Sequence, residues 1–329
     1  PKYYPVSVCG YHLRESGAGP VQEIAYAFCI ARAYLQVGLQ RGLPIDDFAG
    51  HLSFNFDIHG NLFEQVAKFR AARRLWAKLV RDEFGAQEDD SLKMKMIAGG
   101  GGGGLTIEQP ENNIVRGAYY ALISALSGAQ TMALCSYDEA YTIPTEKAAL
   151  VSLRTMQILV EEMGMCDTVD PLGGSYYVEW LTGEMEKRIA AEMRRVDTEW
   201  GGILRAVQDG TVQREVAARA LAYEQGLQDG SIPKVGVNRH RMDEETRQVE
   251  LHPYRPEQAQ ASIRRTAEVV AGRDARAAAA ALERLRDAAR EGTNVMPAMM
   301  DSVRSYATLG EITQALKSVF GEFREPSLF

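Results

Sequence analysis

Tyr11 and His12 are the first adjacent side chains whose chemistry and position suggest a reactive site. They directly follow the apolar run Val6–Cys9, which has the length and composition of a β-strand. A histidine at the carboxyl end of a strand can donate a hydrogen bond to a substrate carbonyl or act as a general acid or base. A lone histidine is more often a surface or packing residue, so both interpretations stay open at this point.

Six consecutive glycines, Gly99–Gly104, follow another predicted strand, Leu92–Ala98. Successive unhindered N–H groups at the mouth of a helix can bind an anion or let a flat ligand approach closely. The run is not a Walker A loop, because Leu105 and Thr106 stand where Lys and Ser or Thr are required. A flexible connector is the alternative, but ordering six glycines costs much conformational entropy. The run therefore favours close approach of a ligand or of backbone.

Asp138 and Glu139 follow the predicted strand Thr131–Cys135. Their carboxylates can accept hydrogen bonds from sugar hydroxyls, or they can simply place negative charge near the start of the next helix.

Histidine and cysteine spacing typical of a metal site is absent from the sequence, so no metal is expected. A GxSxG nucleophile elbow is also absent, although a dispersed Ser-His-Asp triad stays open.

Four strand–loop–helix units in the first 150 residues must position these side chains. The predicted strands are Val6–Cys9, Leu52–Phe56, Leu92–Ala98 and Thr131–Cys135, and the helices start at Pro20, after Asn61, at Pro110 and after Thr145. This alternation predicts an α/β fold with parallel strands and crossover helices. The loops after the strands then share one edge, where barrel enzymes carry their chemistry. Four units fit half of an eightfold barrel or an open sheet, and periodicity does not separate the two.

Beyond about residue 170 the pattern becomes mainly helical. Helices are predicted over 175–198, 202–208, 212–228 and from Pro256 to the end, with one extended piece at Val235–Asn238 and a polar linker between Pro233 and Pro253. We therefore expect two regions, residues 1–170 and 171–329. The Ala-rich stretch Arg273–Glu291 is typical of a solvent-lined packing helix.

Composition narrows the class of protein. The 329 residues carry a net charge of −7, which argues against a nucleic-acid partner, and no apolar stretch is long enough to span a membrane. The four cysteines lack CxxC pairing and stand in apolar runs, which predicts buried free thiols and a cytoplasmic location. The chain has no initiator Met, so we expect a fragment or a cut chain.

An ordered series of stretches resembles the methylmalonyl-CoA mutase family. It comprises PVSVCGYHLRESGA, LPIDDFAGHLSFNFDIHGNLFEQVAKFRAARRLWAKL, LTIEQPENNIVRGA, GAQTMALCSYDEAYTIPTEKAA, DTVDPLGGSYYVEWLT, GVNRHRMDEE and LGEITQALKSVFGE. The resemblance implies that the chain is the C-terminal half, the last four βα units, of a (β/α)8 TIM-type barrel that threads a CoA ester along its axis. It also implies adenosylcobalamin at one end of that barrel and a radical isomerisation of the acyl group.

The resemblance carries roles to individual residues. His12 matches the histidine that hydrogen-bonds the thioester carbonyl, and Tyr11 matches a tyrosine near substrate and corrin. Ser53 matches a serine that helps bind CoA, while Gln130 and Glu139 match polar residues on the adenosyl and corrin side.

Several positions depart from the family pattern. The arginine before Leu-Ser is His51, which weakens a CoA phosphate contact unless that histidine is protonated. The Arg-x-His-x-Gln strand becomes Lys95, Ile97 and Gly99, and its polar continuation becomes glycine, including Gly100 and Gly101 beside the expected cofactor. Lys95 keeps the positive charge. The lost side chains free volume, which suggests a bulkier or branched acyl group, such as an alkylsuccinyl group.

The resemblance also implies partners. Nothing in the chain matches the four earlier barrel strands. Asp57-Ile58-His59-Gly60 resembles the start of the cobalamin-ligating DxHxxG motif, but position 62 is Leu and that motif belongs to another type of domain. An N-terminal barrel half and a cobalamin-binding domain or small subunit are therefore expected from elsewhere. The alternative to an enzyme is a non-catalytic scaffold or degenerate paralogue of a mutase. A third hypothesis is a phosphate-binding barrel hydrolase, but the sequence shows no base–nucleophile pair for it.

Overall fold

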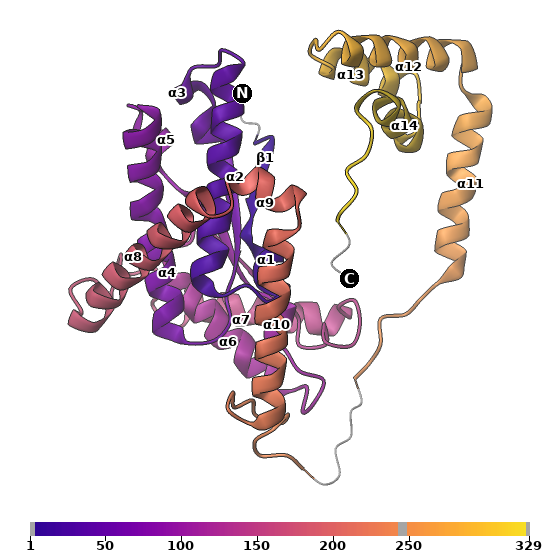
Figure 1. The fold of residues 1–329 in the computed structure, drawn as a ribbon. Coiled ribbons are helices and arrows are strands. Elements are labelled where there is room, and N and C mark those ends of the chain that lie inside the picture. Colours follow the sequence, from indigo (N-terminus) through magenta and orange to yellow (C-terminus); the bar gives the residue numbers. More distant parts are fainter. Residues whose placement is uncertain (1–3, 243–248, 327–329) are drawn as a thin grey trace. The chain divides into compact units, whose positions relative to one another are not determined.

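The fold of the first part of the chain is built on a four-stranded parallel sheet whose strands follow one another in sequence order (Figure 1). The computed structural model describes residues 4–242 and 249–326. The strands are β1 (Val6–Cys9), β2 (Leu52–Asp57), β3 (Lys95–Gly100) and β4 (Thr131–Leu134). Each neighbouring pair is parallel, so the predicted α/β organisation is confirmed.

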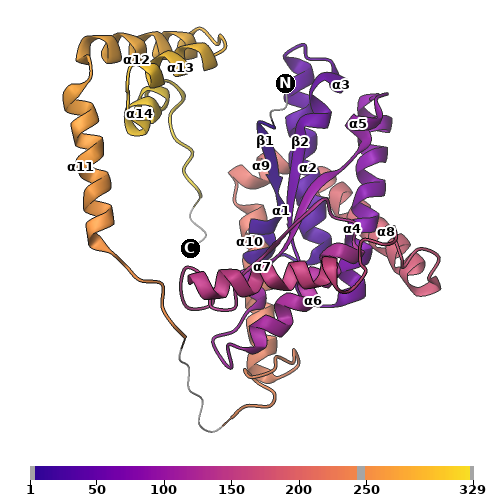
Figure 2. The same ribbon diagram turned by 180° about the vertical axis from the view of Figure 1, so that it is seen from behind.

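Helices connect the strands and cover one face of the sheet (Figures 1 and 2). They are α1 (Gly10–Glu15), α2 (Pro20–Gln40), α3 (Ile45–Phe48), α4 (Leu62–Lys78), α5 (Asp89–Leu92), α6 (Asn112–Leu126) and α7 (Glu146–Glu161). The predicted caps are present: the Asn61 side chain accepts a hydrogen bond from the Glu64 N–H, and the Thr145 side chain accepts one from the Ala148 N–H. Local sequence thus starts α4 and α7 where expected.

The core lies between this sheet and its helices. Phe54 of β2 packs against Phe28 of α2 and Trp76 of α4, with ring centroids 5.7 and 4.9 Å apart. The alternating strand side chains Ser53 and Asn55 point to the opposite face and are only half-buried. Parallel sheets are normally covered on both faces. The second face of this sheet is therefore open within the described residues and carries small and polar side chains.

The helical segment after residue 170 belongs to the same compact unit as the sheet. α8 (Tyr176–Thr198) packs on α2 and α4, while α9 (Ile203–Gln208) and α10 (Thr211–Asp229) follow it. The apolar face of α8, which includes Val178, Ile189 and Val196, packs into the main core. For this reason the chain divides at His252–Pro253 rather than at the predicted residue 170.

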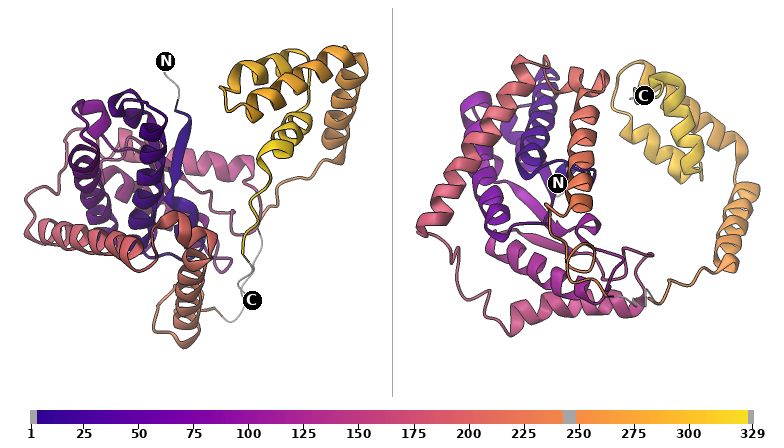
Figure 3. Two further views of the ribbon diagram at one scale, coloured as in Figure 1. Left: turned by 45° about the horizontal axis from the view of Figure 1, so that its top comes forward. Right: turned by 60° about the horizontal axis from the view of Figure 1, so that its bottom comes forward.

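The second unit is a separate group of helices (Figure 3). It contains α11 (Pro256–Gly272), α12 (Ala275–Arg290), α13 (Met296–Arg304) and α14 (Leu309–Phe320). Leu282 and Leu285 of α12 pack with Ile312 and Ala315 of α14. The predicted packing helix Arg273–Glu291 is thus α12.

Some sequence-based expectations need correction or fall outside the described part. The predicted linker and the end of GVNRHRMDEE lie partly on residues 243–248, outside the described residues. The four cysteines are free, as predicted, but only Cys29 is buried: Cys9 and Cys135 are half-buried, and Cys166 is exposed in a turn. Among the residues that the structure describes, no helix has the length and apolarity needed to cross a bilayer.

Candidate functional site

The carboxyl ends of the outer strands meet around Tyr11. This residue lies in α1, directly after β1, and the Cys135 thiol, which follows β4, is one of its neighbours. Burial, together with the neighbouring Cys135, Glu15 and Asp57, raises the pKa of Tyr11, which stays a neutral hydrogen-bonding phenol. His12, beside it, is exposed.

The carboxylate pair after β4 divides into two roles. Asp138 is buried, and its Oδ2 accepts hydrogen bonds from the N–H and hydroxyl of Thr145, both at 2.9 Å, so it fixes the start of α7. Glu139 is half-buried and accepts a hydrogen bond from the Ser136 N–H at 2.6 Å. Burial and the charge of Glu139 raise the pKa of Cys135 to about 12. Tyr11 and Glu139 are therefore both neighbours of Cys135.

The glycine run serves close approach by the protein's own carboxylates. Gly99 and Gly100 belong to β3, so the strand begins and ends later than predicted. Beyond it, the Gly101 N–H donates to Asp57 Oδ1 at 2.8 Å, and the Gly103 N–H donates to Glu15 Oε2 at 2.9 Å. The sequence predicted close approach of a ligand or of backbone, whereas the groups that approach Gly101 and Gly103 in the structure are carboxylate side chains of this chain.

Alanine substitution in the glycine run should have effects that depend on position. A Cβ at Gly101 would overlap the carboxylate oxygens of Glu15 and Asp57, whereas at Gly102 the nearest atom, Glu15 Oε2, is 3.7 Å away. We expect Gly101→Ala to lower the free energy of unfolding by about 1–3 kcal/mol and Gly102→Ala to change it by less than about 0.5 kcal/mol. Urea unfolding of the two variants measures this difference, and equal losses would show that the run needs glycine for another reason.

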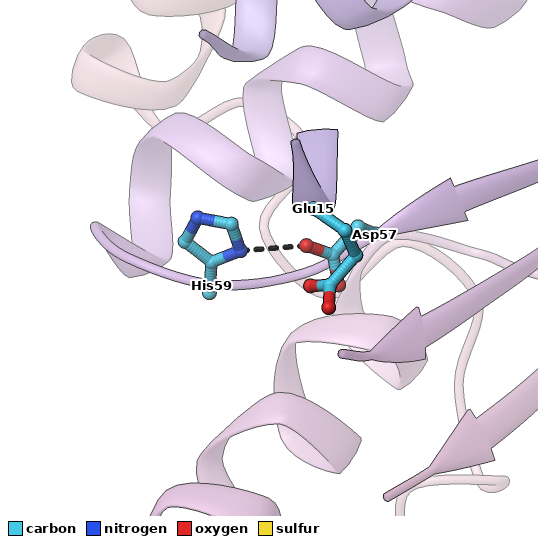
Figure 4. Close-up of side chains that lie close together, drawn as sticks. All are labelled: Glu15, Asp57 and His59. Atoms are coloured by element: carbon cyan, nitrogen blue, oxygen red, sulfur yellow. Dashed lines mark hydrogen bonds and ion pairs between the residues drawn. The ribbon is translucent and has the colours of Figure 1, made fainter. Parts of the chain in front are cut away.

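Glu15, Asp57 and His59 form a compact cluster beneath this loop (Figure 4). His59 Nδ1 lies 2.6 Å from Asp57 Oδ2, while Asp57 Oδ1 accepts hydrogen bonds from the N–H groups of Ile58 and Gly101. Asp57 is fully buried. Although burial opposes ionisation, the hydrogen bond and charge of His59 and the charge of Lys68 keep the pKa of Asp57 below its usual value. Asp57 is therefore an ionised anchor for the histidine ring.

Glu15 should make stability depend on pH. Burial and the Asp57 carboxylate raise the pKa of Glu15 from 4.5 to about 7. The folded chain therefore keeps this proton to higher pH than the unfolded chain, and the resulting stabilisation, complete below pH 4.5, is lost as pH rises through about 7. After solvent screening we expect a loss of about 1 kcal/mol. Denaturation of wild-type and Glu15→Gln chains between pH 5 and 8 tests this, because the variant should lack that part of the slope.

The remaining predicted residues lie at the opposite, amino end of the sheet. Lys95 Nζ donates to the Gly50 carbonyl at 2.5 Å and to Asp90 Oδ2 at 2.6 Å, and the His51 ring packs against Tyr4. Ser53 donates to the Val6 carbonyl at 3.4 Å. The predicted site residues thus form two sets, separated by the length of the strands. A strand of six residues such as β2 is about 20 Å long.

Gln130 belongs to the amino-end set, contrary to its expected pairing with Glu139. It precedes β4, whereas Glu139 follows it, so the two cannot face the same side of a ligand at one end of the sheet. Gln130 is exposed, and its Oε1 accepts a hydrogen bond from the Met96 N–H at 2.9 Å. Its observed role is to join the starts of β3 and β4.

Sequence reasoning missed the role of Asp57 and Glu15. Ser53, Asn55 and Asp57 alternate along β2 and so share one face, which is a signal that points Asp57 toward the open side of the sheet. The proximity of Glu15 depends on the position of α1 and carries no comparable local signal.

Comparison with known proteins gives a consistent family assignment. A family model described as methylmalonyl-CoA mutase matches residues 1–322. The 2-hydroxyisobutanoyl-CoA mutase large subunit of Aquincola tertiaricarbonis is 40% identical over 100% of this chain and 58% of its own length. The methylmalonyl-CoA mutases of Cereibacter sphaeroides and Homo sapiens are 39% and 35% identical, each over 98% of this chain and over 45% and 43% of their own lengths. The chain spans about half the length of the curated relatives it matches.

Proposed function

The chain belongs to the methylmalonyl-CoA mutase family, and from that premise we propose that it forms the carboxyl-terminal half of the acyl-CoA-binding barrel of an adenosylcobalamin-dependent mutase. The reaction is an isomerisation in which a group migrates between neighbouring carbons of the acyl chain. The observation that carries the proposal is the placement of Tyr11 and His12 at the carboxyl end of a parallel sheet, within a family match over nearly the whole chain.

The open sheet face supports the barrel half. Four parallel strands in sequence order, covered on one face, are the arrangement that four further βα units would close into a (β/α)8 barrel. On the open face, the small or uncharged side chains of Ser53, Asn55 and Ala133 stand between Lys95 at the amino end and Asp57 at the carboxyl end. The small side chains leave room for an extended ligand along the strands. The earlier strands and a cobalamin-binding domain or small subunit are the proposed partners.

The two sets of residues suit the two ends of a CoA ester. His12 would hydrogen-bond the thioester carbonyl, with Tyr11 beside the acyl group. Ser53, His51 and Lys95 would contact the CoA portion at the amino end of the sheet. A strand length of about 20 Å matches an extended pantetheine chain better than a compact ligand.

The carboxyl end also fits the adenosyl group of the cofactor. Its polar groups are the Tyr11 hydroxyl and the half-buried Glu139 carboxylate, and the backbone at Gly99–Gly101 has no side chains. When bound, adenosylcobalamin supplies the radical that removes a hydrogen atom from the acyl group. Glu139 would accept a hydrogen bond from a ribose hydroxyl, and the half-buried phenol of Tyr11 and thiol of Cys135 would help to keep water away from that end.

The acyl group is proposed to be bulkier or more branched than methylmalonyl, such as an alkylsuccinyl or branched short-chain group. Ile97 and Gly99 replace the family's histidine and glutamine on the open face, which removes two polar contacts and frees volume. A relative with 40% identity is named for a branched, hydroxylated acyl group. A panel of acyl-CoA esters tests this, and a wide preference for methylmalonyl-CoA would contradict it.

Native mass spectrometry of the complex captured with this chain as bait tests the assembly. We expect a barrel amino-terminal half and a DxHxxG protein, on one polypeptide or several. A complex that contains these parts but neither binds cobalamin nor turns over any acyl-CoA would favour the non-catalytic scaffold instead.

A further inference from the structure

His59 is a fixed, partly open histidine that the family roles described above leave unused. It follows β2, and its Nδ1 is held at 2.6 Å by Asp57 Oδ2. Its side chain is 15% exposed, and within the described residues its Nε2 makes no hydrogen bond. Figure 4 shows this second ring nitrogen on the side away from Asp57.

The support behind the ring is rigid. Asp57 is fully buried, and its Oδ1 is occupied by the Ile58 and Gly101 N–H groups. Its own N–H donates to Glu23 Oε1, and its carbonyl accepts from Lys68 Nζ, both at 2.7 Å. These contacts hold Asp57 against His59, so the ring orientation is fixed before any ligand arrives.

We propose that the Asp57–His59 pair is a binding site for a hydroxyl group of the substrate's acyl moiety. With Nδ1 bonded to Asp57, Nε2 is the ring nitrogen left to form a hydrogen bond, and a hydroxyl group suits it because a hydroxyl can both donate and accept. This assignment rests on the proposed mutase function and adds a specificity-determining residue to it.

The charges around the pair favour a neutral donor over an anion. Glu15 lies beside Asp57, and the glycine-run N–H groups that would otherwise attract an anion already bind these two carboxylates. Arg14 donates to the carbonyls of Ala18 and His59, and Lys68 is paired with Glu23. A ligand carboxylate or phosphate placed at Nε2 would therefore meet two carboxyl groups, while Arg14 and Lys68 already bind groups of this chain.

The neighbouring strand favours the substrate as the source of the hydroxyl. β2 lies next to β1, which carries His12, the residue proposed to bind the thioester carbonyl. A hydroxyl close to that carbonyl would therefore lie at the ends of two adjacent strands, and the test below separates it from a hydroxyl of the cofactor ribose.

The test uses the assembled mutase and pairs of acyl-CoA esters that differ only in a hydroxyl or hydrogen on the branched carbon. Turnover gives kcat/KM for each ester, and equilibrium binding to cobalamin-free enzyme gives Kd. The variants are His59→Phe, which keeps a ring but has no acceptor, and His59→Gln, which keeps an acceptor. His252→Phe is the matched control, because His252 is an exposed histidine whose Nδ1 also has a hydrogen-bond partner, the Pro144 carbonyl at 3.1 Å.

We expect the wild type to prefer the hydroxylated ester, and His59→Phe to lower that preference about 10–100-fold in both kcat/KM and Kd. His59→Gln should recover part of it, and His252→Phe should leave it unchanged. An unchanged preference in correctly folded His59→Phe would overturn the proposal. Equal turnover losses on both esters with unchanged ester Kd would also overturn it and assign the hydroxyl to the cofactor ribose. A wild-type preference in Kd without turnover of any ester would instead refute the mutase function and leave the hydroxyl site standing.

Discussion

Replacing His12 with alanine is expected to lower kcat/KM of the assembled mutase by about 10²–10³-fold. A hydrogen bond to the thioester carbonyl strengthens as negative charge develops on that oxygen during migration, so its loss affects the transition state more than substrate binding. The fall should therefore appear mainly in kcat. Steady-state kinetics with the best ester of the acyl-CoA panel measure it.

The stability of the His12→Ala chain separates a catalytic role from a structural one. His12 is exposed, and its ring contacts only the edge of the Tyr11 ring at a centroid distance of 5.8 Å among the ring contacts described. We expect its thermal unfolding midpoint to stay close to that of the wild type. His252→Ala, at another exposed histidine, controls for the loss of a surface imidazole. A fall below about fivefold in kcat/KM would remove His12 from the catalytic group.

Local sequence signals predicted the elements of the first unit well. Asn61 and Thr145 start their helices by capping them, and the predicted strands Val6–Cys9 and Leu52–Phe56 form neighbouring parallel strands. Each of these features depends on residues close together in sequence, so pattern and capping chemistry suffice. The carboxyl-end location of Tyr11 and His12 follows directly from them.

Long-range packing decided what the sequence could not predict. α8 has many charged residues, yet Val178 and Ile189 pack into the main core, which moves the boundary between units to His252–Pro253. Glu15 and Asp57 are 42 positions apart, and only the approach of α1 to the glycine run brings them together. For Gln130, the family resemblance suggested a place beside Glu139 on the adenosyl and corrin side. In the structure Gln130 precedes β4 and Glu139 follows it, so the two lie at opposite ends of that strand.

Lys68 is the sharpest example, and it carries the largest expected effect on stability. A lysine in a helix is normally solvated, but Lys68 of α4 is fully buried. Its Nζ donates to Glu23 Oε2 and to the Asp57 carbonyl, each at 2.7 Å. This buried ion pair joins α2, α4 and the carboxyl end of β2, so it also supports the Asp57–His59 pair.

Lys68→Met is expected to lower the free energy of unfolding by about 3–5 kcal/mol, because it leaves the Glu23 carboxylate buried without a cation. Adding Glu23→Gln should recover much of this loss, since the amide is neutral and its oxygen can still accept from the Asp57 N–H. Urea unfolding of the single and double variants gives the coupling between the two sites.

Lys187→Met is the control for losing a lysine from an ion pair. Lys187 is 76% exposed and pairs with Glu184 at i,i+3, so its replacement should cost less than about 0.5 kcal/mol. If Lys68→Met lowers the free energy of unfolding no more than Lys187→Met does, the buried Lys68–Glu23 pair contributes no more to stability than an exposed pair. If the double variant loses the sum of the two single losses, Lys68 and Glu23 act independently, and the support of the Asp57–His59 pair must come from the backbone contacts of Asp57 alone.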